Sequence, residues 1–143
     1  MIVSSKESEA NVNLVLSTIE TVFDEHDVGA VDRFFSQNFV QHSPYVPAGG
    51  KRELKEWWQR TVEAIPDLRG SVEHVVAAED SVVVFRKLRG TIKKDMPELG
   101  IKADNQTLEF KVAHLFQVND GKIVSHWEIM DSGPAAKLAI ESM

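Results

Sequence analysis

One histidine lies in a run of apolar residues whose side chains alternate between two faces. His114 shares one face of the expected strand Leu108–Val118 with four apolar residues: Phe110, Val112, Phe116 and Val118. The other face carries Glu109 and Lys111, so the apolar face is predicted to point inward. A buried imidazole near a carboxylate can exchange a proton near neutral pH. We therefore predict that His114 is a general acid or base; the alternative is a core histidine hydrogen-bonded to a neighbouring hydroxyl or carbonyl.

The expected strand Lys122–Asp131 supplies possible partners for His114. Strict alternation places one set of its residues inside: Ile123, Ser125, Trp127, Ile129 and Asp131. It places His126 and Glu128 outside. Asp131 and the loop residue His42 are therefore predicted to converge on His114 at the open end of the sheet. Two histidines and an aspartate could also ligate a metal, but no spacing such as HExxH supports this, so we expect no metal.

The same face assignments predict the walls of a small pocket. The residues expected to contact a bound molecule are apolar or aromatic: Trp127, Phe116, Trp58, Val112 and Phe110. Such a lining, with a few polar groups, is typical of sites for small organic molecules. Because Trp57 and Trp58 are adjacent, we expect only one of them to point fully into the core.

Helices in the first half of the chain would position these strands. Apolar residues recur at spacings of three and four over residues 12–26, which predicts an amphipathic helix. Asp27 can cap a second, shorter helix. A third helix is expected from about Gly50 until Pro66 stops it. Residues 39–44, between the second and third helices, read as a short strand that leads into a loop.

The second half changes its apolar period from about 3.6 to 2, which marks a change from helix to strand. Four strands are predicted: Ser71–Ala77, Ser81–Gly90, Leu108–Val118 and Lys122–Asp131. Asn119-Asp120-Gly121 should join the last two as a tight hairpin, and residues 91–107 should form an exposed loop. Helices followed by hairpins indicate an α+β fold, with three helices against a curved antiparallel sheet.

Composition excludes several classes of partner. The net charge is −6, and the longest basic cluster, around Arg86 and Lys87, is expected on a solvated strand face, so nucleic acid is not an expected partner. There is no cysteine, hence no disulfide or thiolate site. Residues 1–13 lack the pattern of a signal peptide, and no apolar run reaches the ~20 residues that span a bilayer. A cytoplasmic location is the expectation.

Two segments resemble a known family. Residues 118–128, VNDGKIVSHWE, resemble the DGKIVEHWD signature of SnoaL-like proteins, which belong to the nuclear-transport-factor-2-like superfamily. Residues 39–44, FVQHSP, followed by Gly49-Gly50, resemble the Y-x-Q-H-N-P…G segment of a SnoaL-like group described as predicted aldol-condensation enzymes. The resemblance extends from about Asn11 to Asp131.

The resemblance implies one cone-shaped α+β domain over residues 1–143, with a core at about 11–131 and a C-terminal tail at 132–143. It also implies a homodimer packed through the outer face of the sheet. Polyketide cyclases of this type close a ring by intramolecular aldol condensation without metal or cofactor, using an Asp on the penultimate strand. His114 occupies that position in the family's D-I/L-F pattern, while Ser125 and Glu128 replace the usual Glu and Asp.

Three functions remain in competition on sequence alone. The first is a cofactor-free lyase or isomerase for a small apolar carbonyl compound, acting by aldol-type cyclisation, dehydration or enolisation. His114 would exchange the proton there, oriented by Asp131 and His42. The alternative is a non-catalytic small-molecule-binding or dimerisation module with the same fold. A third hypothesis is a protein-interaction domain that uses an apolar patch at residues 45–47.

Overall fold

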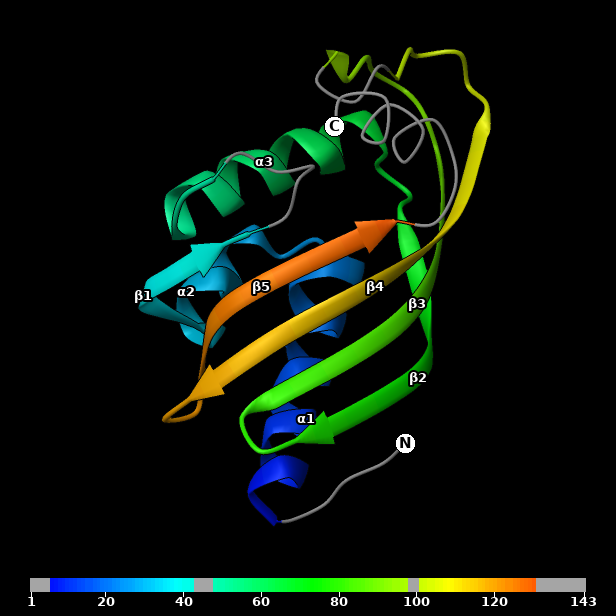
Figure 1. Cartoon of the computed structure of the whole chain (residues 1–143). Helices are drawn as coiled ribbons and strands as arrows, with labels where there is room; N and C mark the ends of the chain where they lie inside the picture. Colours follow the sequence, from blue (N-terminus) through cyan, green and yellow to red (C-terminus); the bar gives the residue numbers. More distant parts are fainter. Residues whose placement is uncertain (1–5, 43–47, 98–100, 131–143) are drawn as a thin grey trace.

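Helices cover one face of a five-stranded sheet in the computed structural model, which describes residues 6–42, 48–97 and 101–130 (Figure 1). The helical elements are α1 (Lys6–Thr18), the π-helical turn η1 (Ile19–Asp24), the 3-10 turn η2 (Val28–Ala30), α2 (Val31–Phe34) and α3 (Lys51–Ala64). The strands are β1 (Phe35–Gln41), β2 (Arg69–Ala78), β3 (Ser81–Thr91), β4 (Thr107–Asn119) and β5 (Lys122–Met130). The predicted α+β class and the order of elements are confirmed.

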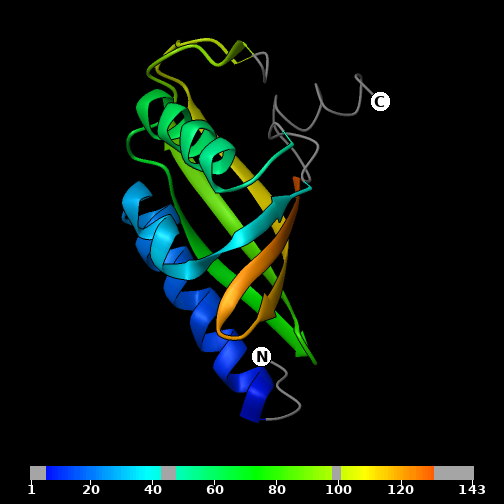
Figure 2. The same ribbon diagram turned by 90° about the vertical axis from the view of Figure 1, so that its left-hand side faces the viewer.

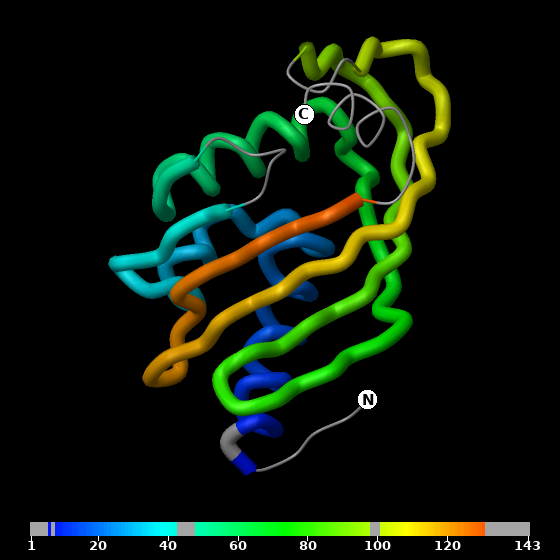
Figure 3. The backbone as a smooth tube through the Cα atoms, viewed as in Figure 1, coloured from blue at the N-terminus to red at the C-terminus, as the bar shows by residue number. Residues whose placement is uncertain are grey.

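The sheet has the order β1-β5-β4-β3-β2 and is mixed. The four long strands pair antiparallel, as predicted, whereas β1 pairs parallel to β5. The smooth backbone trace shows β3 and β4 bending along their length (Figure 3). Asp120 and Gly121 both have positive φ, 51° and 70°, which is the type I′ geometry expected of this hairpin. The sequence predicted the antiparallel pairing of these four strands and did not reveal that the short strand β1 joins the sheet in parallel.

The helices lie on one face of the sheet, as a side view shows (Figure 2). Val12, Val15 and Ile19 are buried along α1 and η1, at the spacing that predicted them. Helix α3 begins after Gly50, whose N–H donates to Glu53 at 3.0 Å, and ends before Pro66. No helix among the described residues is long and apolar enough to cross a membrane.

Both adjacent tryptophans of α3 are buried, contrary to the expectation that only one would be. Trp58 donates its indole N–H to the carbonyl of Val22 at 2.8 Å, which anchors α3 on η1. Trp57 is covered in part by Arg60, whose guanidinium lies 5.9 Å from its ring centroid. Two successive tryptophans can therefore be buried, because the Val22 carbonyl accepts from one indole and the Arg60 side chain covers the other.

An extra residue in β5 reverses the face assignments predicted for that strand. Val118 pairs with Ile123 but Gln117 pairs with Ser125, so Val124 has no opposite partner and forms a bulge. The side chains beyond the bulge consequently point the other way. His126 is buried, 1% exposed, whereas Trp127 and Ile129 lie on the outer face.

The expectations for two neighbouring parts of the chain meet different outcomes. Most described residues between β3 and β4 (92–97 and 101–106) are exposed and irregular, as predicted, but Ile92, Met96 and Ile101 are buried, and Met96 and Ile101 form a bridge. Arg86 is not on a solvated face, because its side chain is only 2% exposed. It points inward since it alternates with Val84 and Leu88, both of which are buried.

Candidate active site

Two imidazoles and an amide form a buried hydrogen-bonded chain across three strands. Nδ1 of His114, on β4, lies 2.9 Å from Nε2 of His126, on β5. Nδ1 of His126 lies 3.0 Å from Oε1 of Gln41, on β1. All three side chains are buried, and the parallel pairing of β1 with β5 sets Gln41 beside His126. Nε2 of His114 is buried without a hydrogen-bond partner among the described residues.

Burial keeps both histidines neutral at pH 7. Desolvation lowers the pKa of His126 from 6.5 to about 3. Desolvation also lowers the pKa of His114 well below its ordinary value, with smaller contributions from His126 and Arg86. A neutral imidazole with so low a pKa is a poor proton acceptor, but it still donates and accepts hydrogen bonds. The prediction that His114 lies inside the sheet is confirmed.

Glu128 is the acid/base candidate that the structure adds. It is opposite His114 across the β4–β5 ladder, and one carboxylate oxygen lies within 4.8 Å of a ring nitrogen of each histidine. Burial raises the pKa of Glu128 from 4.5 to about 7, and the positive charge of Arg86 offsets part of that rise. The residue as a whole is half-buried, whereas both histidines are buried. Both protonation states are populated near neutral pH.

A buried ion pair closes the other side of the cluster. Arg86, on β3, pairs with Asp24, at the end of η1, and Asp24 also accepts from the backbone N–H of Gly70 at 3.2 Å. Desolvation lowers the pKa of Arg86, an effect that Asp24 opposes. Nε of Arg86 has no partner among the described residues. The Arg86 guanidinium therefore brings a positive charge that acts on the Glu128 carboxylate, and its Nε–H remains available as a hydrogen-bond donor.

The residues predicted for the site are not all brought together. His42 follows Gln41 and so points outward, where its exposed ring stacks on Trp127 at 4.3 Å. The predictions that His42 orients His114 and that Trp127 lines the interior are therefore wrong. Asp131 lies outside the described residues. The other predicted wall residues are all buried: Phe110, Val112, Phe116 and Trp58.

Sequence reasoning missed Gln41, His126, Glu128 and Arg86. The signal for two of them was present, because residues at positions i and i+2 of one strand share a face and His126 and Glu128 must point the same way. What the sequence did not reveal was the bulge at Val124 that decides which way. Gln41 directly precedes His42, which the sequence analysis had predicted as a site residue. The side chain of Gln41 points inward because of the register between β1 and β5.

The spacing of His114, His126 and Glu128 is also compatible with a metal ion, since one donor atom from each lies within 4.8 Å of the others. Two observations argue against that use. The facing nitrogens of the histidines are hydrogen-bonded to each other. The charge of Arg86 acts on both His114 and Glu128 and would repel a divalent cation. Direct proton exchange suits the arrangement better.

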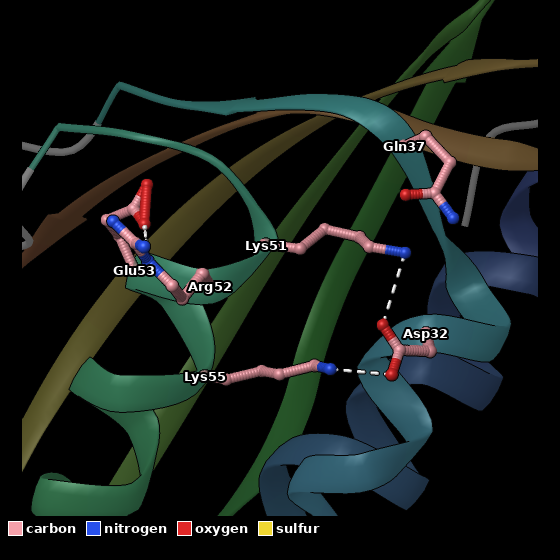
Figure 4. Close-up of a pocket in the computed structure, with 6 residues that line it drawn as sticks. All are labelled: Asp32, Gln37, Lys51, Arg52, Glu53 and Lys55. Atoms are coloured by element: carbon pink, nitrogen blue, oxygen red, sulfur yellow. Dashed lines mark hydrogen bonds and ion pairs between the residues drawn. The ribbon is translucent and has the colours of Figure 1, made fainter.

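A separate hollow lies on the surface between α2 and α3 (Figure 4). Asp32 there accepts from Lys55 at 2.6 Å and lies 3.2 Å from Lys51. These hydrogen bonds lower the pKa of Asp32, the one with Lys55 having the largest effect. Both lysines form ion pairs with Asp32, and the hollow is open to solvent. We therefore do not assign a catalytic or binding role to this hollow.

Comparison with known proteins decides the family. The sequence matches the family of SnoaL-like polyketide cyclases over residues 13–137. The chain belongs to this family. The search of curated proteins gave no match.

Solved structures similar to this SnoaL-like protein share its fold at low identity. A protein from Jannaschia sp. CCS1, assigned as a SnoaL-like polyketide cyclase, superposes with a TM-score of 0.81 at 22% identity, covering 99% of this chain and 96% of its own. AclR from Streptomyces galilaeus, assigned as a hydroxylase, gives 0.78 at 19% identity, covering 94% and 98%. A protein from Acidithiobacillus ferrooxidans, assigned as a polyketide cyclase, gives 0.76 at 19% identity and full coverage of both chains. These similarities confirm the cone-type α+β fold expected from the resemblance.

Proposed function

We propose that this SnoaL-like protein catalyses cofactor-independent acid–base chemistry on a small, largely apolar carbonyl compound, by aldol-type cyclisation, dehydration or enolisation. The observation that carries the proposal is Glu128, which faces the two buried histidines and has its pKa raised by burial to about 7. A carboxyl group with such a pKa can both take up and return a proton near neutral pH. Membership of the family supports the reaction class.

In this proposal Glu128 is the general base. Its carboxylate removes a proton from the carbon next to the substrate carbonyl, and the C–H electron pair becomes the enolate. For a cyclisation, the enolate carbon attacks a second carbonyl of the same molecule, and the resulting alkoxide takes the proton back from Glu128. Arg86 lies close enough to stabilise negative charge, because its field reaches the Glu128 carboxylate. His114 is neutral and serves as a hydrogen-bonding group and not as the base.

Deuterium exchange at carbon tests this proposal with a panel of candidate carbonyl compounds. Small ketones, diketones and β-hydroxy ketones are incubated with the protein in deuterated buffer, and exchange of the α-protons is followed by mass spectrometry. Replacing Glu128 by Gln should reduce any exchange by about 100-fold or more. Glu109→Gln, on the outer face of β4 and paired with Lys87, is the matched control and should leave exchange unchanged. Equal exchange by Glu128→Gln and the parent protein would refute the assignment, and saturable binding without exchange would favour the binding-module alternative.

The outer face of the sheet supports the further proposal of a homodimer. Phe85, Ala113 and Ile129 are opposite one another on β3, β4 and β5, and the two larger side chains are 44% and 64% exposed. Leu115 and Trp127 form the next row. We call these five residues the outer apolar patch. A contiguous apolar surface across three strands is typical of a protein interface, and a second copy of the chain presents the same surface.

A further inference from the structure

The hydrogen-bonded chain at the centre of the site has only one arrangement of protons when the amide oxygen of Gln41 faces His126. That oxygen can only accept, so Nδ1 of His126 carries a proton. His126 is neutral, hence its Nε2 has none and accepts from Nδ1 of His114. His114 is neutral as well, so its proton is on Nδ1 and its Nε2 presents a lone pair.

The side chain opposite His114 on the neighbouring strand could supply a donor to that lone pair. Nε2 of His114 is buried and has no hydrogen-bond partner among the described residues. Glu128 is opposite His114 on the neighbouring strand, with an oxygen within 4.8 Å of a ring nitrogen. A protonated carboxyl group is a donor that a bare ring nitrogen can accept from, whereas an ionised carboxylate is not.

We infer that Gln41 is a positioning residue: its amide oxygen fixes the protons of His126 and His114, so that Nε2 of His114 accepts a hydrogen bond from the carboxylic acid form of Glu128. This inference rests on the proposed role of Glu128 and extends it to a residue on a different strand, β1. A hydrogen bond to the neutral form of an acid favours that form. Gln41 thus helps hold the proton that Glu128 returns to the substrate.

Among the residues that the structure describes, few other charges act on Glu128. The groups that face it are Arg86 from β3, with Asp24 of η1 behind it, and the ring nitrogens of His114 and His126. The buried residues described on α3 and β2 have no titratable side chain: Leu54, Trp57, Trp58, Thr61, Ala64, Val75 and Ala77. A change confined to Gln41 leaves all these charges in place.

Long-range ¹H–¹⁵N spectra of the full-length protein test the inference directly, because the chain has only five histidines. In the parent protein we expect Nε2 of His114 to be of the unprotonated type, with a shift that changes as Glu128 ionises near pH 7. Replacing Gln41 by Leu removes the acceptor. His126 can then donate from Nε2, His114 carries its proton on Nε2, and this N–H donates to the ionised carboxylate. The pKa of Glu128 should fall by about one unit or more.

Two matched variants complete the experiment. Gln41→Glu keeps an acceptor for Nδ1 of His126 and should keep the parent tautomers, while its negative charge raises the pKa of His126. Gln37→Leu makes the same replacement at an exposed position of β1 and should change nothing. A proton on Nε2 of His114 in the parent protein, or parent tautomers in Gln41→Leu, would overturn the inference. If Gln41→Leu does not fold, an unmoved titration of both histidines in Gln41→Glu overturns it equally.

These spectra need no substrate, so the inference and the proposed function can fail separately. Loss of deuterium exchange in Glu128→Gln, together with parent tautomers in Gln41→Leu, would leave Glu128 as the base and remove the role of Gln41. Exchange that survives in Glu128→Gln, together with reversed tautomers in Gln41→Leu, would remove Glu128 as the base and keep the positioning role of Gln41.

Discussion

Removing the ionisable group at the centre of the site should make the protein more stable at alkaline pH. The folded-state pKa of Glu128 is raised from 4.5 to about 7, so folding favours the protonated form. Between these two values the folded state binds more protons than the unfolded state. The free energy of unfolding therefore falls as pH rises from 4.5 to 7 and is constant above that. Glu128→Gln removes this titration while keeping the shape of the side chain.

The size of the effect follows from the pKa shift. The shift is 7 − 4.5, or about 2.5 units, and each unit corresponds to about 1.4 kcal/mol. Glu128→Gln should thus gain about 3 kcal/mol relative to the parent protein above pH 7, and nothing from this source below pH 4.5. In a domain of this size that corresponds to a rise in melting temperature of about 6 °C or more. A destabilising carboxylate at this position is consistent with the proposed role of Glu128 as the base.

Urea denaturation of both proteins at intervals from pH 4 to 9 measures the difference. The difference in the free energy of unfolding between Glu128→Gln and the parent protein should grow from pH 4.5 to 7 and then stay constant. Glu109→Gln is the control, and since Lys87 lowers the pKa of Glu109, its titration has the opposite sign. A difference between Glu128→Gln and the parent that does not vary with pH would refute the reasoning, because it would place the carboxyl group in a water-like environment.

Three other predictions concern the groups around the site. Because burial lowers the pKa of His126 to about 3, the free energy of unfolding should fall as pH drops from 6.5 toward 3. His126→Gln should reduce this fall in urea denaturation. The measurement is made in the Glu128→Gln background, where the opposite pH dependence caused by Glu128 is absent. Asp24→Asn leaves a buried guanidinium unpaired and should destabilise by about 3–5 kcal/mol in urea denaturation, whereas Asp32→Asn, at a surface pair, should have little effect. Phe85→Glu on the outer apolar patch should convert a dimer to a monomer in sedimentation velocity; a monomeric parent protein would contradict the homodimer.

The sequence by itself determined most of the architecture. Alternation in β4 is unbroken from Thr107 to Asn119, so His114 and its apolar neighbours were placed on the correct face by local pattern alone. The spacing of apolar residues set the buried sides of the helices, and the Asp120-Gly121 turn set the β4–β5 hairpin. These features depend on interactions among residues close in sequence, which a single chain displays directly.

The composition of the site was decided by tertiary structure. A bulge at Val124 reverses β5, so His126 and Glu128 enter the interior and Trp127 leaves it. The parallel docking of β1 selects Gln41 over His42 as the inward residue. The bulge and the docking of β1 both depend on how β5 pairs with its neighbouring strands. The free energy gained by burying the apolar face of the sheet is larger than the cost of interrupting the alternation in one strand. Periodicity reports which residues of a strand share a face, but only packing against the rest of the fold settles which face is inside.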